Sequence, residues 1–389
     1  MTGARAVDPR LIVDDSRTWR EADLPVRIVH LIAAARPNFM KVAPLWHALK
    51  ASGDHRPVLV HTGQHYDANM SADFLADLGL PEPDFHLGVG SGSHAEQTGK
   101  VMIAYGAVAE AHRPDWLVVV GDVNSTIACA LVGTKLGIPT VHLEAGLRSR
   151  DRNMPEELNR LATDVLCDVL WTPSPDADRN LIAEGIPPSR ISRVGNIMLD
   201  SFEMSRPAIE AAAMPDTLGL TRGGYAIVTL HRPSNVDDPA QLRRLAEALI
   251  AIQPLLPIVF PVHPRTAARL AAAGLEGALE AAGVRVIAPI PYIRFMSLVL
   301  GAGAVITDSG GLQEETTYLG IPCFTLRDNT ERPVTIEEGT NRLATAATLP
   351  GLVEASLSAG RPAPRRPEYW DGGTAARCVE DLRRRADAG

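Results

Sequence analysis

Short apolar runs that end in a glycine or a charged residue recur along the chain and alternate with amphipathic segments. Val118-Val119-Val120 is followed directly by Gly121-Asp122, and the apolar run 139–143 is followed by Glu144. Continuous apolar runs of this length are typical of strands that are buried on both faces of a parallel sheet. Such a strand, loop and helix repeat predicts doubly wound α/β architecture, in which ligands bind at the carboxyl ends of the strands.

The repeat occurs in two series, which predicts two domains. We expect strands from 27–32 to 190–194 in the first series and from 225–230 to 322–326 in the second. Segment 202–224 has few strand formers and several prolines and glycines, so the junction is expected there. The prediction is two doubly wound Rossmann-like domains that face each other across a cleft. Its expected parts are an N-terminal extension 1–25, a first domain 26–204, a second domain 205–372, and a C-terminal helix and tail 373–389.

Composition excludes several classes of protein. The chain has 389 residues with 46 acidic and 38 basic side chains, a net charge of −8 and no basic run, so nucleic acid is not an expected partner. No apolar stretch reaches the roughly 18 residues that a membrane-spanning helix needs. The charged segment 1–26 lacks the apolar centre of a signal peptide. Four widely spaced cysteines indicate buried thiols, and together these features predict a cytoplasmic protein.

The motifs for common cofactors are missing. No GxGxxG follows the first strand, and the chain has no GxxxxGK[ST] sequence. No spacing of histidine and cysteine suggests zinc. We therefore expect neither a nicotinamide cofactor nor a bound metal.

Charged side chains cluster where the strands of the first series end. Asp122 and Glu144 each follow a strand, and Glu156, Glu157 and Arg160 lie on the first turns of a helix that begins at Pro155. Two structural alternatives remain open for these residues. Asp122 would also suit the cap of the helix that opens near Asn124, and Arg148 or Arg160 would suit a purely structural partner of Glu144.

Basic residues are expected in the loop after the first strand. This loop is predicted at 33–41 and contains Arg36 and Lys41, with the next helix starting at Val42. An anion would be received at such a position, between the end of a strand and the start of a helix. His142 lies inside an expected strand and is predicted to be a core residue.

The second series places another polar cluster at its strand ends. His231 follows the first of these strands and is a candidate acid or base, although a hydrogen-bonded structural histidine is an equally common outcome. Ser309-Gly310-Gly311 opens a helix, where backbone N–H groups bind phosphate. Glu315 lies one turn further on and suits ribose hydroxyls. Arg332 brings positive charge to the same edge.

Eight motifs in unbroken order resemble those of the non-hydrolysing UDP-N-acetylglucosamine 2-epimerases. They are ARPNFMK, TGQHYDANMS, GDVNST, HLEAGLRS, MPEELNR, TLHRPSN, TDSGGLQEE and RDNTERP, and the resemblance covers residues 26 to 360. It implies the two-domain GT-B fold and an isomerase that interconverts UDP-N-acetylglucosamine and UDP-N-acetylmannosamine, as in polysaccharide biosynthesis. We also expect a homodimer with a UDP-sugar substrate and no membrane partner.

The resemblance assigns roles at the matching positions. The catalytic residues that it implies are Asp122, Glu144, Glu156 and His231. The substrate-binding residues that it implies are Arg36, Lys41, Arg160, Phe295, Ser309, Gly310, Gly311, Glu315 and Arg332, with Phe295 beside the uracil. Gln64 and His65 lie near a second UDP-N-acetylglucosamine site that activates some bacterial members.

Two loops depart from the family pattern. AARPN stands where many members have GTRPE, so the carboxylate at position 38 is replaced by Asn38, and HRPSNVD stands where many have HRREN. These departures affect the expected substrate detail and activating site more than the reaction class.

The chemistry favours elimination and readdition of UDP, because no carbonyl makes the C2 proton acidic and no bound nicotinamide is expected to oxidise C3. Three other functions remain open: a hydrolysing 2-epimerase that releases N-acetylmannosamine and UDP, a GT-B glycosyltransferase, and a non-catalytic nucleotide-sugar sensor. The transferase would leave several carboxylates unexplained. The sensor would have to keep buried, unpaired carboxylates without a use.

Overall fold

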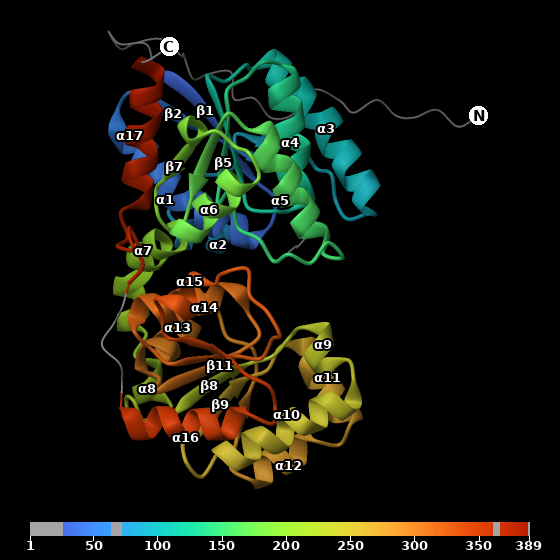
Figure 1. The fold of residues 1–389 in the computed structure, drawn as a ribbon, viewed down its shortest axis with the longest axis vertical. Coiled ribbons are helices and arrows are strands. Elements are labelled where there is room, and N and C mark those ends of the chain that lie inside the picture. Colours follow the sequence, from blue (N-terminus) through green and yellow to red (C-terminus); the bar gives the residue numbers. More distant parts are fainter. Residues whose placement is uncertain (1–25, 64–71, 361–365, 388–389) are drawn as a thin grey trace, which may run out of the picture. The chain divides into compact units, whose positions relative to one another are not determined.

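The computed structural model describes residues 26–63, 72–360 and 366–387 and divides the chain into two compact units (Figure 1). The first unit comprises Met1–Ile197 and Gly373–Gly389, and the second comprises Met198–Gly372. Each unit is built on one sheet with helices on both faces. The predicted fold of two parallel-sheet α/β domains is therefore confirmed.

The sheet of the first unit has the strand order β3-β2-β1-β4-β5-β6-β7, and each printed pair of neighbours is parallel. The order runs outward in both directions from β1 and β4, so the chain changes direction between these two strands. The crevice at such a switch point is where open α/β sheets bind ligands. The strands are β1 (Arg27–Ala33), β2 (His55–His61), β3 (Phe85–His86), β4 (Trp116–Val120), β5 (Thr140–Leu143), β6 (Val169–Thr172) and β7 (Ile191–Arg193).

Helices cover both faces of this sheet. Helices α3, α4 and α5 form a layer on one face, and α1 packs with α17 on the other (Figure 1). The helices are α1 (Arg36–Ser52), α2 (Ala72–Asp77), α3 (His94–Ala111), α4 (Asn124–Lys135), α5 (Pro155–Leu166), α6 (Pro175–Ala183) and α17 (Thr374–Asp387), with a short 3₁₀ helix at Pro188–Arg190.

The second unit repeats this topology. Its sheet has the order β10-β9-β8-β11-β12-β13, with a switch point between β8 and β11. The strands are β8 (Ala226–Thr229), β9 (Ile258–Pro261), β10 (Arg285–Ile287), β11 (Ala304–Thr307), β12 (Cys323–Thr325) and β13 (Asn341–Leu343). The helices are α7 (Ile197–Ala211), α8 (Met214–Thr217), α9 (Pro233–Val236), α10 (Pro239–Ile252), α11 (Pro264–Ala272), α12 (Glu276–Ala281), α13 (Tyr292–Gly301), α14 (Gly310–Leu319), α15 (Val334–Glu337) and α16 (Leu349–Ala359).

The central strands are buried along their whole length, as their continuous apolar sequences predict. Every residue of β4 and of β11 is buried, because helices cover both faces of each sheet. In the second unit, two apolar clusters lie against the sheet: Ile306 belongs to one and its neighbour Val305 to the other. Each fully buried Val, Ile or Leu contributes about 1.5–3 kcal/mol relative to an exposed side chain. This packing makes the strand ends rigid supports for the side chains that follow them.

The helix after β1 starts earlier than predicted. The loop predicted at 33–41 ends at Ala35, and α1 begins at Arg36 rather than Val42. The Asn38 side chain accepts a hydrogen bond from the Ala35 amide at 3.0 Å, which satisfies a free N–H group of the first turn. Arg36 and Lys41 are consequently helical residues held by a rigid element.

The structure differs from the expected boundaries in three places. The units divide inside α7, at Ile197–Met198, whereas the sequence placed the boundary after residue 204. The C-terminal helix α17 belongs to the first unit, where its Asp381 accepts a hydrogen bond from Trp171 Nε1 at 2.8 Å. Strands β3 and β13 were not predicted, because their two and three residues are too few to show an alternating pattern. The expected extension 1–25 lies outside the described residues.

Candidate active site

Side chains from the segments that follow three strands lie at the switch point of the first unit. Lys41 lies on α1 after β1, Asp122 follows β4, and Glu144 follows β5. Since β1, β4 and β5 are parallel neighbours in this order, their carboxyl ends lie at the same edge. The topology therefore assembles the charges that the sequence placed at strand ends.

Lys41 and Glu144 form a salt bridge that is largely closed to solvent. The Glu144 side chain is only 5% exposed. Glu144 also has a backbone φ of +70°, an uncommon value for a residue other than glycine. Backbone strain of this kind costs on the order of 1–3 kcal/mol and clusters at functional sites. The partner of Glu144 is thus Lys41, and the alternatives Arg148 and Arg160 are wrong.

Asn38 ties α1 to the end of β4. Its Nδ2 donates to the Val120 carbonyl at 3.2 Å, while its Oδ1 accepts from Ala35. Asn38 was discussed in the sequence only as the replacement of a family carboxylate. Its position as the third residue of a helix was the signal for a capping role.

Asp122 is held by an arginine and does not cap the following helix. Arg160 Nε donates to Asp122 Oδ2 at 3.1 Å, and the cap position of α4 is Val123, which makes no side-chain cap hydrogen bond. The capping alternative for Asp122 is therefore wrong. About a third of the Asp122 side chain remains exposed, so its carboxylate is accessible from solvent.

The adjacent residues Glu156 and Glu157 differ sharply in their surroundings. Glu157 is buried, pairs with Arg160, and accepts the backbone amides of Ser149 and Arg150, both at 2.9 Å. Glu157 therefore holds the loop that precedes α5. Glu156 is half-buried and has no hydrogen bond or ion pair within the described parts of the chain. Of the two carboxylates, only Glu156 is unoccupied by structural contacts.

The pairing of these carboxylates bears on the sensor alternative. Glu144 is neutralised by Lys41 and Asp122 by Arg160. A paired carboxylate can be kept in a protein without a catalytic use. The expectation that unpaired buried carboxylates argue against a sensor is therefore not met, and a turnover measurement has to decide.

His231 and Asp308 form the corresponding pair at the switch point of the second unit. Nδ1 of His231 lies 2.8 Å from Oδ1 of Asp308, which is fully buried. Burial alone would raise the pKa of Asp308, but the contacts from His231 and the Arg232 amide bring it below its usual value. Because Nδ1 faces Asp308, Nε2 is the ring nitrogen left for a ligand. The His231 side chain is 45% exposed.

The turn after β11 has the form of a phosphate site. Ser309 is the cap residue of α14, and Gly310 and Gly311 are its first two residues. A Cβ atom on Gly310 would lie 2.8 Å from Glu331 Oε1 and 3.0 Å from Arg332 Nη1, so only glycine fits there without a shift. Arg332 thus lies directly beside the N-terminus of α14, where two sources of positive potential combine.

Arg332 is fixed by two carboxylates. It pairs with Glu314 and with Glu331, each at 2.7 Å, and Glu331 also pairs with Arg327 at 2.8 Å. Burial would raise the pKa of Glu331, but Arg332 and Arg327 hold it well below its usual range. This network fixes the orientation of both guanidinium groups.

Glu315 occupies an apolar environment on α14. Burial raises its pKa to about 7, although it accepts a hydrogen bond from the Tyr292 hydroxyl at 2.8 Å. Tyr292 and Phe295 both lie on α13, and Phe295 packs, partly buried, against the apolar core of the unit. Asp308 and Tyr292 support His231 and Glu315 but were not among the predicted site residues, because nothing in the sequence pairs them with these partners.

The predicted residues fall into one group in each unit. The first-unit group consists of Arg36, Lys41, Asp122, Glu144, Glu156 and Arg160, at the carboxyl edge of the first sheet. The second-unit group consists of His231, Phe295, Ser309, Gly310, Gly311, Glu315 and Arg332, with Phe295 on α13 and the others at or after strand ends. Gln64 and His65 lie outside the described residues.

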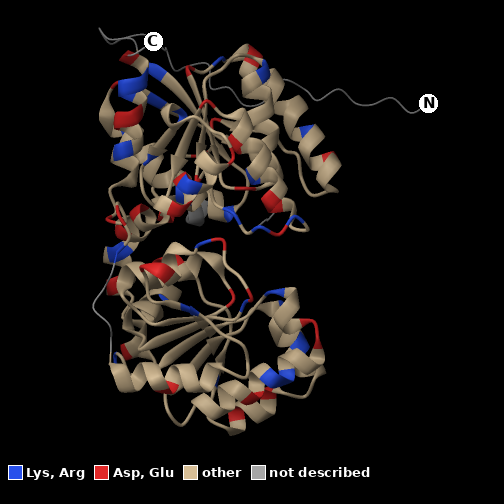
Figure 2. Ribbon diagram, in the orientation of Figure 1, with Lys and Arg blue, Asp and Glu red and all other residues tan. Residues whose placement is uncertain are grey.

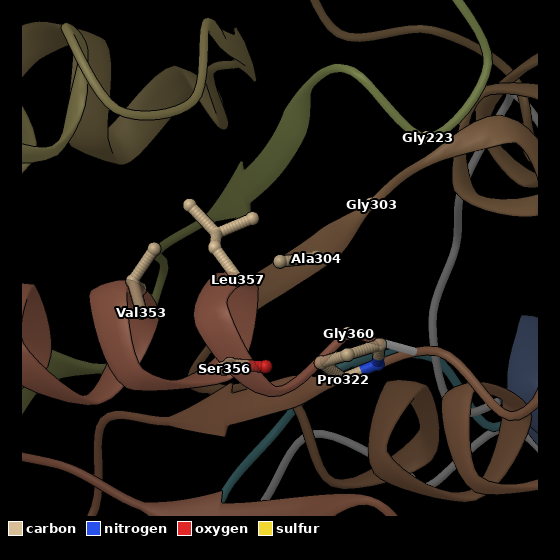
Figure 3. Close-up of a pocket in the computed structure, with 8 residues that line it drawn as sticks. All are labelled: Gly223, Gly303, Ala304, Pro322, Val353, Ser356, Leu357 and Gly360. Atoms are coloured by element: carbon tan, nitrogen blue, oxygen red, sulfur yellow. The ribbon is translucent and has the colours of Figure 1, made fainter. Parts of the chain in front are cut away.

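Other features of the described residues lie apart from these groups. A pocket in the second unit is lined by Gly223, Gly303, Pro322 and residues of α16, at the amino ends of the strands (Figure 3). Within the described ranges, no cluster of His, Cys, Asp and Glu side chains could hold a metal ion, and no helix is long and apolar enough to cross a membrane. Acidic and basic residues are interspersed along both units (Figure 2).

Comparison with known proteins relates the chain to one family. The family model for UDP-N-acetylglucosamine 2-epimerase matches residues 47–383. A UDP-N-acetylglucosamine 2-epimerase from Methanocaldococcus jannaschii is 40% identical over 326 residues, covering 80% of this chain and 87% of the relative. A UDP-2,3-diacetamido-2,3-dideoxy-D-glucuronate 2-epimerase from Pseudomonas aeruginosa is 39% identical over 349 residues, covering 89% and 96%.

Solved structures agree with these relationships. The crystal structure of the M. jannaschii UDP-GlcNAc 2-epimerase in complex with UDP-GlcNAc and UDP is similar, with a TM-score of 0.79 and 38% identity over 91% of this chain and 99% of that chain. The Neisseria meningitidis UDP-GlcNAc 2-epimerase bound to UDP-GlcNAc gives a TM-score of 0.82 and 26% identity over 92% and 100%. Because the family model and these relatives span most of the chain, the protein belongs to the UDP-N-acetylglucosamine 2-epimerase family and is an isomerase that acts on a UDP-sugar.

Proposed function

We propose that the protein is a non-hydrolysing 2-epimerase that interconverts UDP-N-acetylglucosamine and UDP-N-acetylmannosamine. The observation that carries this proposal is the first-unit group: Asp122 and Glu144 directly follow neighbouring strands, and Glu156 lies on the first turn of α5 at the same sheet edge. The family relationship supports the substrate class, since relatives named for this reaction match most of the chain.

The reaction proceeds by elimination and readdition of UDP. A carboxylate removes the proton from C2, and the electron pair of the C2–H bond forms a C1=C2 double bond. The C1–O bond breaks at the same time, and its electron pair leaves with the β-phosphate oxygen of UDP. The product is an unsaturated glycal. A second carboxylate returns a proton to the opposite face of C2, and any one of the β-phosphate oxygens of UDP bonds to C1 again. This route contains no hydride transfer, so it needs no nicotinamide, and the positive groups proposed for the diphosphate make a metal ion dispensable.

The first-unit group supplies the proton chemistry. Asp122, Glu144 and Glu156 provide carboxylates for the two faces of C2. Lys41 fixes the position of Glu144, and Arg160 fixes that of Asp122. Fixed positions speed proton transfer, because the reacting atoms must lie about 3–3.5 Å apart. Arg36, the first residue of α1, adds positive charge at the same edge.

The second-unit group binds the nucleotide and stabilises UDP as it leaves. The backbone N–H groups of Gly310 and Gly311, the Ser309 hydroxyl and the Arg332 guanidinium bind the diphosphate. The Ser309 amide itself donates to the Thr307 hydroxyl at 2.9 Å. His231 stands beside this turn because its partner Asp308 directly precedes Ser309. Its Nε2 is placed to donate to the departing phosphate oxygen, which is where negative charge develops. Glu315 accepts hydrogen bonds from ribose hydroxyls, and Phe295 lies against the uracil.

A second substrate follows from one of the relatives. The P. aeruginosa protein named for a UDP-diacetamido-glucuronate is nearly as similar as those named for UDP-N-acetylglucosamine, and the match covers more of its length. Its substrate has the same UDP group and the same acetamido group at C2, so the same chemistry applies. The assay should therefore offer both UDP-sugars.

The test is incubation of the purified protein with each UDP-sugar in heavy water, followed by NMR of the products. We expect deuterium at C2 of the manno epimer first and of both epimers later. An isotope label in the bridging C1–O–P oxygen should scramble into the non-bridging phosphate oxygens, because released UDP can rotate before it returns.

Other outcomes would identify the remaining functions. Stoichiometric release of free N-acetylmannosamine and UDP would place the protein in the hydrolysing class. Turnover that needs an acceptor and leaves C2 free of deuterium would indicate a glycosyltransferase. Tight binding of the UDP-sugar with neither product nor deuterium would indicate a sensor.

We also propose a cytoplasmic location. Cys129, Cys167 and Cys323 are buried free thiols. Unpaired thiols are typical of reducing compartments.

A further inference from the structure

Four buried or half-buried charged side chains, linked by salt bridges, lie next to the loops that carry Asp122 and Glu144. His142 on β5 is fully buried, and its Nδ1 lies 2.6 Å from Oδ1 of Asp164 on α5. Arg148 Nη2 lies 2.7 Å from the other oxygen of Asp164, and Arg148 also donates to both carboxylate oxygens of Glu184. The sequence predicted His142 only as a core residue. Its contacts instead connect it to the active-site backbone.

The hydrogen bonds determine the proton content of the His142 and Asp164 pair. His142 Nε2 lies 2.7 Å from the Gly121 carbonyl oxygen, which can only accept, so Nε2 carries a proton. A second proton must lie between Nδ1 and Asp164 Oδ1, because two lone pairs at 2.6 Å would repel each other. Two protons are thus shared between the imidazole and the carboxyl group.

The second proton belongs on His142. Imidazole is a stronger base than carboxylate by about 2.5 pKa units in water. Asp164 Oδ2 already accepts from Arg148 and from the Gly146 amide at 3.1 Å, both of which favour the ionised carboxylate. Burial alone would raise the pKa of Asp164, but His142 and Arg148 hold it below its usual value. With His142 and Arg148 positive and Asp164 and Glu184 negative, the four groups have no net charge.

These groups hold the backbone of the two loops that carry Asp122 and Glu144. His142 binds the carbonyl of Gly121, the residue directly before Asp122. Asp164 binds the amide of Gly146, two residues after Glu144, and Arg148 Nη1 donates to the Leu147 carbonyl at 2.7 Å. None of the four side chains belongs to the first-unit group. Their contacts fix the positions of the peptide groups next to the reacting carboxylates.

We propose that His142 and Asp164 are positioning residues: a buried imidazolium–carboxylate pair that fixes the loops of Asp122 and Glu144 in the geometry needed for proton transfer at C2. This inference rests on the proposed epimerase function for its kinetic part. Its structural part does not depend on the reaction: His142 is charged, and the His142–Asp164 pair holds the two loops by hydrogen bonds.

The charged state is tested by nitrogen NMR of the full-length protein labelled at histidine. We expect both ring nitrogens of His142 to be protonated, with a strongly downfield Nδ1 proton, because each faces an oxygen acceptor. Asp164→Asn should remove this signal. A spectrum of His142 with only Nε2 protonated would overturn the assignment.

Two substitutions at Asp164 separate hydrogen bonding from charge. In Asp164→Asn, the amide donates to neutral His142 while its oxygen still accepts from Arg148 and Gly146, so every contact is kept and kcat should stay within about threefold. Asp164→Ala loses all of these contacts, and kcat should fall roughly 10–100-fold, since misplacement by about 1 Å has effects of this size. UDP affinity should be unchanged in both, because the UDP-binding residues lie in the second unit.

Asp381→Ala is the matched control for loss of stability. Asp381 is a buried carboxylate of the same unit that accepts from Trp171, Ser192, Arg384 and Arg385 but contacts neither loop. We expect it to lower the melting temperature without lowering kcat of the folded enzyme. An equal loss of kcat in Asp381→Ala and Asp164→Ala, or full activity in Asp164→Ala, would overturn the positioning role.

Amide hydrogen exchange separates failure of this inference from failure of the proposed function. Asp164→Ala should speed exchange at Gly121 and Gly146, and Asp381→Ala should not. If the wild-type protein leaves both UDP-sugars free of deuterium, the epimerase proposal fails. The NMR spectrum still decides whether His142 is charged, and amide exchange still decides whether Asp164 holds the two loops. Unchanged amide exchange at both glycines in Asp164→Ala would show that the pair does not hold the two loops.

Discussion

Lys41 and Glu144, which are 103 residues apart in the chain, form a salt bridge across the end of β4. Lys41 lies on the helix after β1, Glu144 follows β5, and β4 lies between these two strands. Gly121 follows that strand, and a Cβ atom there would lie 3.5 Å from Lys41 Nζ and 3.7 Å from Glu144 Oε2. With φ at +70°, Gly121 also has a backbone conformation that suits glycine. The contact joins helix α1 to the turn at Glu144 across the turn at Gly121.

Removing the Glu144 charge should abolish turnover and spare UDP binding. In Glu144→Gln the carboxylate is lost but the shape is kept, so we expect no measurable epimerisation and a UDP affinity within about tenfold, or about 1.4 kcal/mol. Calorimetry with UDP and the heavy-water assay measure the two effects. If Glu144→Gln lost both UDP binding and thermal stability, Glu144 would instead have a structural role.

Removing Lys41 should destabilise the fold through its partner. Lys41→Met leaves the Glu144 carboxylate buried and uncompensated, which typically costs about 3–5 kcal/mol. The double variant Lys41→Met with Glu144→Gln should recover much of this loss in urea denaturation. A double variant as unstable as the sum of the single variants would mean that the two side chains do not interact.

Glu156 and Glu157 provide a comparison of function with structure at adjacent positions. Glu156→Gln should abolish turnover with little change in melting temperature, because Glu156 has no hydrogen bond or ion pair within the described residues. Glu157→Gln should lower the melting temperature, because Glu157 holds Arg160 and two backbone amides. Asp122→Asn should resemble Glu156→Gln in activity. A fully active Glu156→Gln or Asp122→Asn would remove that residue from the mechanism.

The positions of the site residues along the fold were predictable because strand order and loop position follow local rules. Apolar runs located β4 and β11, and parallel strands deliver whatever follows them to one edge. Asp122, Glu144 and the turn at Ser309 were found in this way. The start of α1 was predicted too late, because the side-chain contact of Asn38 replaced a conventional cap at Ala35.

The partners of these residues were not predictable in the same way. A charged side chain at a strand end has several possible partners, and the choice depends on which loops meet in space. The sequence offered arginines for Glu144, whereas the structure gives it Lys41 from a distant helix. His142 shows the same limit, since its position in a strand indicates burial but not the three groups linked to it.

Arg332 and Gly310 should control nucleotide binding. Arg332→Ala removes a cation from the start of α14, and we expect UDP affinity to fall by roughly 10–100-fold, the loss typical of a charge-assisted hydrogen bond. Gly310→Ala places a methyl group against Glu331 and Arg332 and should weaken UDP in the same direction. Gly351→Ala on α16 is the control, because a Cβ atom there meets nothing within 4 Å and Gly351 lies outside the second-unit group. Equal losses in both glycine variants would contradict this assignment.

The homodimer that we expect has a candidate surface in the layer of α3, α4 and α5. Ile103 on α3 is 73% exposed and Val165 on α5 is 65% exposed, and both helices pack against α4. Ile103→Glu should give a monomer by light scattering, because a charge at the centre of an apolar interface is costly. Ile182→Glu on α6, which is 54% exposed, is the matched control and should remain dimeric. A dimeric Ile103→Glu variant would exclude this surface.

Glu315 should make both stability and nucleotide binding depend on pH. Its pKa in the folded protein is about 7, raised by burial from 4.5, so between these values the native state binds more protons than the unfolded state. Stability from this group is therefore present at low pH and is lost as pH rises towards 7, by on the order of 3 kcal/mol. The difference in stability between Glu315→Gln and the wild type should accordingly shift in favour of the variant as pH rises.

If ribose hydroxyls donate to the ionised carboxylate of Glu315, UDP-N-acetylglucosamine binding should release a proton near pH 6.5. Calorimetry in two buffers of different ionisation enthalpy measures this release. Tyr292→Phe removes the hydroxyl that lowers this pKa and should move the release to higher pH. Proton release that persists unchanged in Glu315→Gln would show that another group is responsible and that Glu315 does not bind the ribose as an anion.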